Sequence, residues 1–238
     1  MANNTQNSKF KIQNLLSSLN PFGLIACLLA LLCSCEQADD NYRYPSIVTD
    51  YACIVTDPTG HAEQLLLDNG DSYPVSLTDE LIESNNGRAP SFKPDTTYRI
   101  IGMYELITMG TSQTAHLHAI SSTLSHVPTP LRKGEELHQA PVYLQSIWLS
   151  GGYLNIIVEL KALNGKHSIG YVDTTPEGMH GKEFTFYHKV ISDVESYRQK
   201  LYGSIPLTPF NEQLQRGDTL RFVVNTYDKG NTSYDFTF

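Results

Sequence analysis

Residues 142–172 read VYLQSIWLSGGYLNIIVELKALNGKHSIGYV, and this stretch decides the fold class. Apolar and polar residues alternate on both sides of Gly151-Gly152. Alternation interrupted by two glycines predicts two antiparallel strands joined by a two-residue turn. The register of this hairpin pairs Leu149 with Leu154 and Ile147 with Ile156.

Asn164-Gly165 predicts a second hairpin directly after the first, because Asn-Gly between strand sequences favours a tight turn. Its register pairs Ala162 with His167 and Leu160 with Ile169. Side chains two residues apart share a face of a strand, so the pattern predicts one core face and one face towards solvent or a partner. The core face carries Ile147, Leu149, Leu154, Ile156, Val158, Leu160, Ile169 and Tyr171, and the other face carries Ser146, Trp148, Asn155, Glu159, Lys161 and Ser168.

The rest of the second half continues the strand pattern with one interruption. Ser192-Asp-Val-Glu195 has the form of a helix capping box, and apolar residues at helical spacing up to Leu201 predict a helix near 193–202. Further strands are expected at 182–189, 205–209, 218–227 and 233–238. About seven short strands predict an antiparallel β-sandwich over residues 140–238.

The first half predicts a different β domain. Strands are expected at 47–56, 61–67, 72–77, 96–107 and 113–126. A short helix from Ser76 to about Ser84 follows the third strand, and five strands with this helix match the layout of an OB-like barrel, residues 47–128. Residues 127–141 contain three prolines and mixed charge, which predicts the boundary between the two domains. The expected fold is therefore all-β and mainly antiparallel.

The first 34 residues differ from the rest and predict a secretory leader. Lys9 and Lys11 precede an apolar run at 22–32, which is too short to span a membrane. Leu32-Cys33-Ser34-Cys35 then resembles the lipobox of bacterial lipoproteins, in which the last cysteine receives lipid. The resemblance implies that the mature chain begins at a lipidated Cys35, followed by a polar tether over residues 35–46.

Loss of the leader changes the formal net charge from −8 to −10, because it removes two lysines and no acidic residue. An acidic body argues against nucleic acid and against a surface that lies on anionic lipid. Cys53 is then the only cysteine left after Cys35, which excludes an internal disulfide in the mature body and makes a paired-cysteine metal or redox site improbable. The expected contact with a membrane is the lipid on Cys35.

Several segments resemble the NigD-like lipoproteins. They are NYRYPSIVTD (41–50), FKPDTTYRII (92–101), QSIWLSGGYLN (145–155), YHKVISDVESYRQKLYGSIPL (187–207) and DTLRFVVNTY (218–227). The resemblance covers essentially the whole chain and implies an OB-like domain followed by a β-sandwich on a lipid-anchored envelope protein. It implies no catalytic residue and no cofactor.

Two features could carry chemistry or binding. His116 and His118 share one strand face and could meet one metal ion, if His126 or a neighbouring carboxylate supplied a further ligand. The alternative is a pair of polar residues on a wet strand. Trp148 could stack on a sugar or a partner, or the other domain or the helix near 193–202 could cover it.

The sequence contains no G-x-S-x-G elbow, no H-E-x-x-H motif and no phosphate-binding glycine loop. We therefore expect no enzymatic activity, no cofactor and no metal. The expected function is that of a lipid-anchored envelope protein, in the outer membrane and facing the cell surface, that binds or scaffolds an extracytoplasmic protein or glycan. Two alternatives stay open: a metal-dependent hydrolase that uses the histidine strand, and a lipoprotein of bacteriocin production or immunity.

Overall fold

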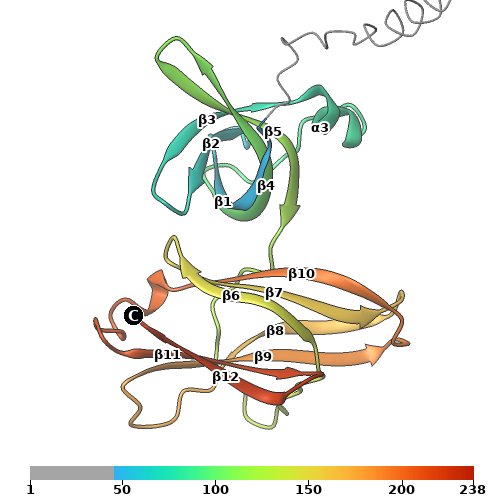
Figure 1. The fold of residues 1–238 in the computed structure, drawn as a ribbon, viewed down its shortest axis with the longest axis vertical. Coiled ribbons are helices and arrows are strands. Elements are labelled where there is room, and N and C mark those ends of the chain that lie inside the picture. Colours follow the sequence, from blue (N-terminus) through green and yellow to red (C-terminus); the bar gives the residue numbers. More distant parts are fainter. Residues whose placement is uncertain (1–45) are drawn as a thin grey trace, which may run out of the picture. The chain divides into compact units, whose positions relative to one another are not determined.

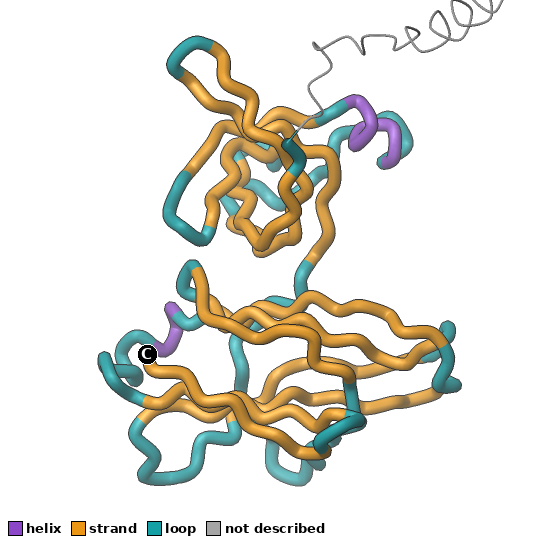
Figure 2. Tube along the Cα trace, viewed as in Figure 1, coloured by secondary structure: helices purple, strands orange, loops and turns teal. Residues whose placement is uncertain are grey.

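The computed structural model describes residues 46–238, which form one compact unit. The predictions for the leader, for Cys35 and for the tether up to Pro45 lie outside these residues. Within residues 46–238 no helix is long and apolar enough to cross a membrane. The described part is built almost entirely from β-strands, as Figures 1 and 2 show, and this confirms the predicted all-β fold class.

The first five strands close into a barrel in the order β1-β2-β3-β5-β4. Thr78 caps the short helix after the third strand, because its hydroxyl accepts a hydrogen bond from the Leu81 amide. This strand order and helix position are those of the predicted OB-like barrel. The elements are β1 (Val48–Thr56), β2 (Ala62–Leu67), β3 (Ser72–Leu77), α3 (Asp79–Ser84), β4 (Thr97–Met109) and β5 (Ser112–Ser122).

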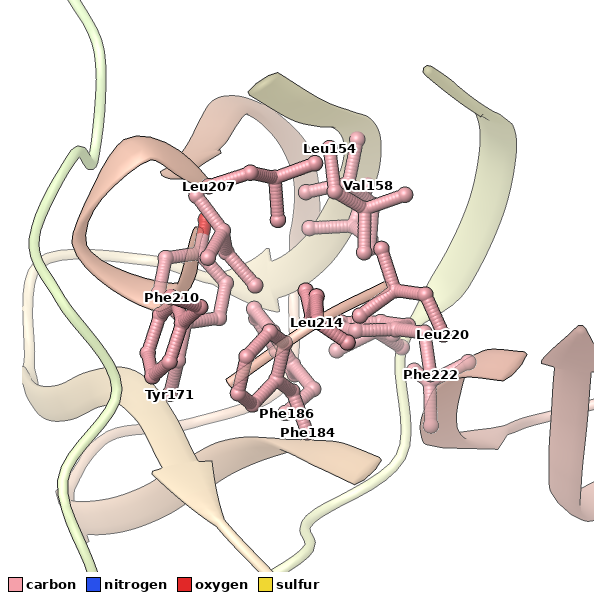
Figure 3. Packing of buried hydrophobic residues seen from close by; sticks show 14 of the residues in the cluster. Leu154, Val158, Tyr171, Phe184, Phe186, Leu207, Phe210, Leu214, Leu220 and Phe222 are labelled. Atoms are coloured by element: carbon pink, nitrogen blue, oxygen red, sulfur yellow. The ribbon is translucent and has the colours of Figure 1, made fainter. Parts of the chain in front are cut away.

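The remaining strands form a sandwich of two sheets, with the orders β10-β7-β6 and β12-β11-β9-β8. The strands are β6 (Tyr143–Ser150), β7 (Tyr153–Ala162), β8 (Lys166–Asp173), β9 (Gly181–Ser192), β10 (Tyr197–Pro206), β11 (Thr219–Thr226) and β12 (Gly230–Thr237). Alternate residues of both sheets meet in one apolar core, part of which is shown in Figure 3. Phe184, Phe186 and Phe222 are the largest side chains buried in it.

The two predicted hairpins have opposite outcomes. The Gly151-Gly152 hairpin is confirmed, with Leu149 opposite Leu154 and Ile147 opposite Ile156. The hairpin at Asn164-Gly165 is wrong, because β7 pairs with β6 and β10 whereas β8 pairs with β9 in the other sheet. The turn at 163–165 therefore carries the chain from one sheet to the facing sheet.

The helix predicted near 193–202 is also wrong, because residues 197–206 form strand β10. This strand pairs with β7 over ten residues, from Tyr197 opposite Ala162 to Pro206 opposite Tyr153. The long ladder with β7 and the packing of Leu201 and Ile205 in the sandwich core outweigh the local helical spacing. The strand predicted at 205–209 shrinks to the end of β10, and the 3-10 helix η1 (Thr208–Phe210) follows it.

The segment between the two domains protects open sheet edges. Leu124 exchanges backbone hydrogen bonds with β10, Thr129 bonds to β8, and Ala140 and Val142 bond to β9 and β11. Edge strands need such cover because their unpaired amides invite pairing with other chains. The barrel strands end at Ser122 and the sandwich strands begin at Tyr143; the predicted domain limits, 47–128 and 140–238, stay predictions.

Candidate functional site

A hollow of the described part lies under an arch formed by residues 126–138. One foot of the arch is Thr129, whose carbonyl accepts from the Asp173 amide at 3.1 Å on the outer edge of β8. The other foot is His138, whose carbonyl accepts from the His188 amide at 2.9 Å on the opposite edge of β9. Because the feet sit on opposite edges of the β8–β9 pair, the residues between them cross its outer face.

The cleft between the arch and the two strands has a volume of about 600 Å³. The outward-facing residues of the strands form its floor, and the arch forms its roof. Ser168 lies opposite Lys189, and Gly170 lies opposite Tyr187 in the ladder. The floor thus presents one aromatic ring, one hydroxyl and one ammonium group, next to a position that has no side chain. The arch contributes Thr129, Pro130, Leu131, Glu135, Glu136 and His138.

Gly170 makes room for the first turn of the arch. A side chain at this position would press on the His126 ring, about 3.2 Å from its Nε2 atom. His126 Nε2 accepts a hydrogen bond from the Tyr171 amide at 3.2 Å, and the two rings lie 5.0 Å apart. Burial lowers the pKa of His126 below its usual value. His126 is therefore a neutral imidazole whose other nitrogen can donate a hydrogen bond to a ligand.

Aromatic and charged groups meet at the second foot. The His138 ring lies edge-on to Tyr187, with ring centres 5.9 Å apart, and Glu136 lies 3.9 Å from the imidazole Nε2. The lining therefore combines an aromatic ring with donors and acceptors of both signs. Such a surface suits a neutral ligand that has many hydroxyl groups and an apolar face.

A buried chain of side chains fastens the second foot. His188 Nδ1 lies 3.0 Å from the Ala140 carbonyl, His188 Nε2 lies 2.8 Å from His167 Nδ1, and His167 Nε2 lies 2.8 Å from Asp193. The two imidazoles are stacked with a ring separation of 5.1 Å. This row of hydrogen bonds joins Ala140, two residues after the arch, to β8, β9 and the β9–β10 turn.

The Asp193 end of this chain is anionic. The bond from His167, with the amides of Val194 and Leu163, lowers the pKa of Asp193 to about 2, so this residue is a carboxylate. Burial lowers the pKa of His188. Asp193 therefore accepts the hydrogen bond from His167 Nε2, at 2.8 Å.

The predicted histidine strand lies elsewhere, on the outside of the barrel. His116 and His118 share one face of β5, and Glu105 Oε1 lies 3.8 Å from the first and 3.3 Å from the second. His126, which could have supplied a further ligand, contacts Tyr171 on the sandwich instead. Within the described range 46–238, no three His, Cys, Asp or Glu side chains are placed to hold a metal ion.

The family follows from the second half of the chain. Residues 126–238, which include the arch and both sheets of the sandwich, match the NigD-like C-terminal β-sandwich domain. The second half of the chain is therefore a NigD-like domain. A NigD-like immunity protein from Bacteroides caccae has a similar structure, with 28% identity, a TM-score of 0.64 and coverage of 82% of this chain and 94% of that one.

Two more distant structures share the fold of this NigD-like chain. A Parabacteroides distasonis protein named as toxin-related is 19% identical, with a TM-score of 0.59 and coverage of 81% and 93%. A Bacteroides fragilis protein named as a lipoprotein is 11% identical, with a TM-score of 0.57 and coverage of 82% and 98%. No curated protein matches the chain in sequence.

The NigD-like sandwich meets the barrel through residues that the alternation placed on the outer face of the sheet. Asn155 is fully buried, and its side-chain oxygen accepts hydrogen bonds from Arg99 of the barrel at 3.0 Å and from Ser204 at 2.7 Å. Trp148 packs edge-on against Tyr51 of the barrel, with ring centres 5.3 Å apart. The barrel therefore contacts this tryptophan, and the helix that could have covered it does not exist.

Sequence reasoning missed the arch cleft and the buried histidine chain of this NigD-like protein. His167 and His188 are 21 residues apart, and Asp193 is 26 residues from His167. The two histidines meet because β8 pairs with β9, with His167 opposite Val190 and His188 opposite Ile169, and the sequence did not predict this pairing. Cys35, the predicted lipidation residue, lies outside the described residues. Cys53 of strand β1 is buried, and its sulfur lies 3.5 Å from the Tyr153 hydroxyl of the sandwich.

Proposed function

We propose that the chain is a lipid-anchored cell-envelope protein that binds a glycan in the arch cleft and catalyses no reaction. The arch cleft is the observation that carries this proposal, because it combines an aromatic floor with hydrogen-bonding groups of both signs. The lipobox ending at Cys35 supports the anchor. The NigD-like domain supports an envelope protein with no assigned catalytic residues.

The chemistry of the lining favours sugars over charged ligands. A sugar ring has an apolar face that stacks on an aromatic side chain, and hydroxyl groups that both donate and accept hydrogen bonds. Tyr187 offers the ring, Ser168 and Lys189 offer donors, and Glu136 offers an acceptor. A phosphate-rich ligand would meet the carboxylates of the arch, and a strongly cationic ligand would meet Lys189.

Binding to an array of immobilised bacterial oligosaccharides tests the ligand class. The mature chain with Cys35→Ser, which stays soluble, should bind a subset of these glycans, and Tyr187→Ala should abolish that binding. Tyr197→Ala is the matched control, because Tyr197 is a 70% exposed tyrosine outside the cleft. Equal binding by the Tyr187→Ala variant, or no bound glycan at all, would contradict the proposal.

The anchor is tested separately in cells. Cys35→Ala should abolish incorporation of radiolabelled palmitate and release the protein from the membrane fraction, whereas Cys33→Ala should leave both unchanged. Protease added to intact cells should cut the wild-type protein, since we propose that it faces outward on the outer membrane. A labelled Cys35→Ala variant would refute the assignment of the lipid to this residue.

A second candidate function is bacteriocin immunity. The observation in its favour is the Bacteroides caccae structure, which is named as a NigD-like immunity protein and shares 28% identity with the chain. A strain that lacks the gene should then become more sensitive to a bacteriocin produced beside it, and the cleft variant Tyr187→Ala should separate immunity from glycan binding. Unchanged sensitivity across the bacteriocins of related strains would rule this candidate out.

A further inference from the structure

The hairpin of β4 and β5 extends beyond the barrel. Strand β1 begins at Val48, which pairs with Tyr104, so the part of β4 after Tyr104 has no partner on that side. It continues only with β5, from Leu106 opposite Ala115 to Met109 opposite Ser112. Figure 1 shows this two-stranded ribbon projecting away from the barrel wall. Because β1 is the first described strand, the ribbon projects past the same end of the barrel at which the chain enters from the tether.

The projecting ribbon exposes aliphatic side chains on both faces and carries no charge. Leu106 and Ile107 are neighbours on opposite faces and are 37% and 36% exposed, and Met109 at the tip is 74% exposed. The sequence from Leu106 to Ala115, LITMGTSQTA, contains no charged residue. A ribbon with aliphatic side chains exposed on both faces has no inner side that the fold itself covers.

More apolar side chains are exposed at the same end of the barrel. Ile47 is 41% exposed and Val48 is 45% exposed, directly after the tether. Eleven residues lie between Cys35 and Ile47, and the twelve Cα-to-Cα steps that join the two reach at most about 40 Å. A lipid on Cys35 therefore keeps this end of the barrel within about 40 Å of the bilayer, whatever path the tether takes.

We propose that the tip of the β4–β5 hairpin docks into the surface of the membrane that holds the lipid anchor. The proposal rests on the lipidation of Cys35 under the proposed function. Docking of the tip buries no charge, because residues 106–115 carry none. The outer edges of the ribbon have no strand partner, so their backbone groups stay in the hydrated headgroup region. Threonine, serine and glutamine side chains of the ribbon suit the headgroup region, and Met109 and Ile107 suit the acyl boundary.

The acidic body and the uncharged tip together specify the kind of lipid surface. A body with a net charge of −10 is repelled by anionic lipid, so the contact must come from apolar side chains rather than from basic residues. A second exposed apolar cluster, at Val190, Ile191, Val194 and Tyr197, lies on the sandwich. It provides a matched control, because Val194 is 68% exposed but belongs to the β9–β10 turn of the sandwich and not to the β4–β5 hairpin.

The test places a single tryptophan at each position. In the mature chain with Trp148→Phe, Met109→Trp and Val194→Trp are made separately, and each protein is coupled through Cys35 to maleimide lipid in phosphatidylcholine vesicles with brominated acyl chains. Cys53 is 4% exposed, so coupling goes to Cys35, and Cys35→Ser gives the uncoupled control. The Met109→Trp emission should fall by roughly half, since interfacial residues lie about 5–10 Å into the boundary, and the Val194→Trp emission should stay unchanged.

Two results would overturn the docking proposal. One is a Met109→Trp emission that bromine does not quench in the coupled protein, and the other is equal quenching at Val194→Trp. Chemical coupling makes this experiment independent of lipidation in cells. A failure of palmitate labelling at Cys35 would therefore refute the anchor, and a failure of quenching would refute the docking of the hairpin.

Discussion

Replacement of Arg99 by methionine should destabilise the fold where the barrel meets the sandwich. The Arg99 side chain is 2% exposed and binds both oxygens of Asp68 within the barrel. The same guanidinium donates to Ser204 and Asn155 of the sandwich at 3.0 Å each, and lies 4.1 Å from the centre of the Tyr153 ring. Burial alone would lower the pKa of Arg99, but the bonds to Asp68 hold it above the usual value. One cation thus serves both domains.

The size of the effect follows from what the substitution leaves behind. Arg99→Met leaves the Asp68 carboxylate without its cation. It also removes the hydrogen-bond donor from the buried side-chain oxygens of Ser204 and Asn155 in the sandwich. Removal of one partner from a buried ion pair costs about 3–5 kcal/mol in the free energy of unfolding. For a protein of this length, about 2–4 °C accompany each kcal/mol, so the melting temperature should fall by roughly 6–20 °C.

Urea denaturation followed by circular dichroism measures this change. Arg221→Met is the control, because Arg221 makes a similar two-bond contact with Asp235 on the exposed surface of β11 and β12. Exposed pairs contribute little, so the control should behave like the wild type. A loss below about 1 kcal/mol for Arg99→Met would refute the reasoning, since it would match a single ordinary hydrogen bond. Full additivity of Arg99→Met with Asp68→Asn would refute it as well.

Three further predictions concern the sandwich. Burial lowers the pKa of His188 in the folded state, so the neutral imidazole favours the fold. The contribution of His188 to stability is therefore complete above about pH 6.5 and is lost as the pH falls towards the lowered pKa. Urea titrations at several pH values should show this loss, and His188→Phe should reduce the dependence of stability on pH. A Cβ atom at Gly203 would overlap the Tyr171 hydroxyl, so Gly203→Ala should cost about 1–3 kcal/mol in thermal unfolding, whereas Gly102→Ala, which meets only the ends of side chains, should cost less. Asp193→Ala should speed hydrogen exchange at the two amides that its carboxylate binds by about tenfold, and unchanged exchange would show that other contacts hold the turn.

Local signals predicted the parts of the fold that depend on neighbouring residues. The Gly151-Gly152 turn and its register follow from the need for positive φ angles and from strand alternation, and the structure has both. The barrel followed from strand lengths and from one helix after the third strand. The two failures share a physical cause. Asn164-Gly165 marks a turn, but a turn does not specify whether the next strand joins the same sheet or the facing one.

The same limit explains the false helix and the missed site. Ser192 and Glu195 have the spacing of a capping box, yet the Asp193 carboxylate between them binds the amides of Leu163 and Val194 and the His167 ring. Those contacts exist only because two connections between the sheets meet at one end of the sandwich. A pattern within ten residues carries no record of that meeting, so neither strand β10 nor the histidine chain was predictable from it.

The arch shows how an edge-covering segment becomes a binding site. Residues 127–141 predicted only a domain boundary, and their prolines suit a segment that must cross a sheet without adding a strand to it. The segment has to reach from the edge of β8 to the edge of β9, because both edges carry amides that need partners. To connect those edges the segment must cross the outer face of the two strands. Gly170 has no side chain, so it leaves room for the segment above that face. The cleft is thus a geometric consequence of protecting two strand edges with one segment. The side chains that line the cleft then determine which ligand it can bind.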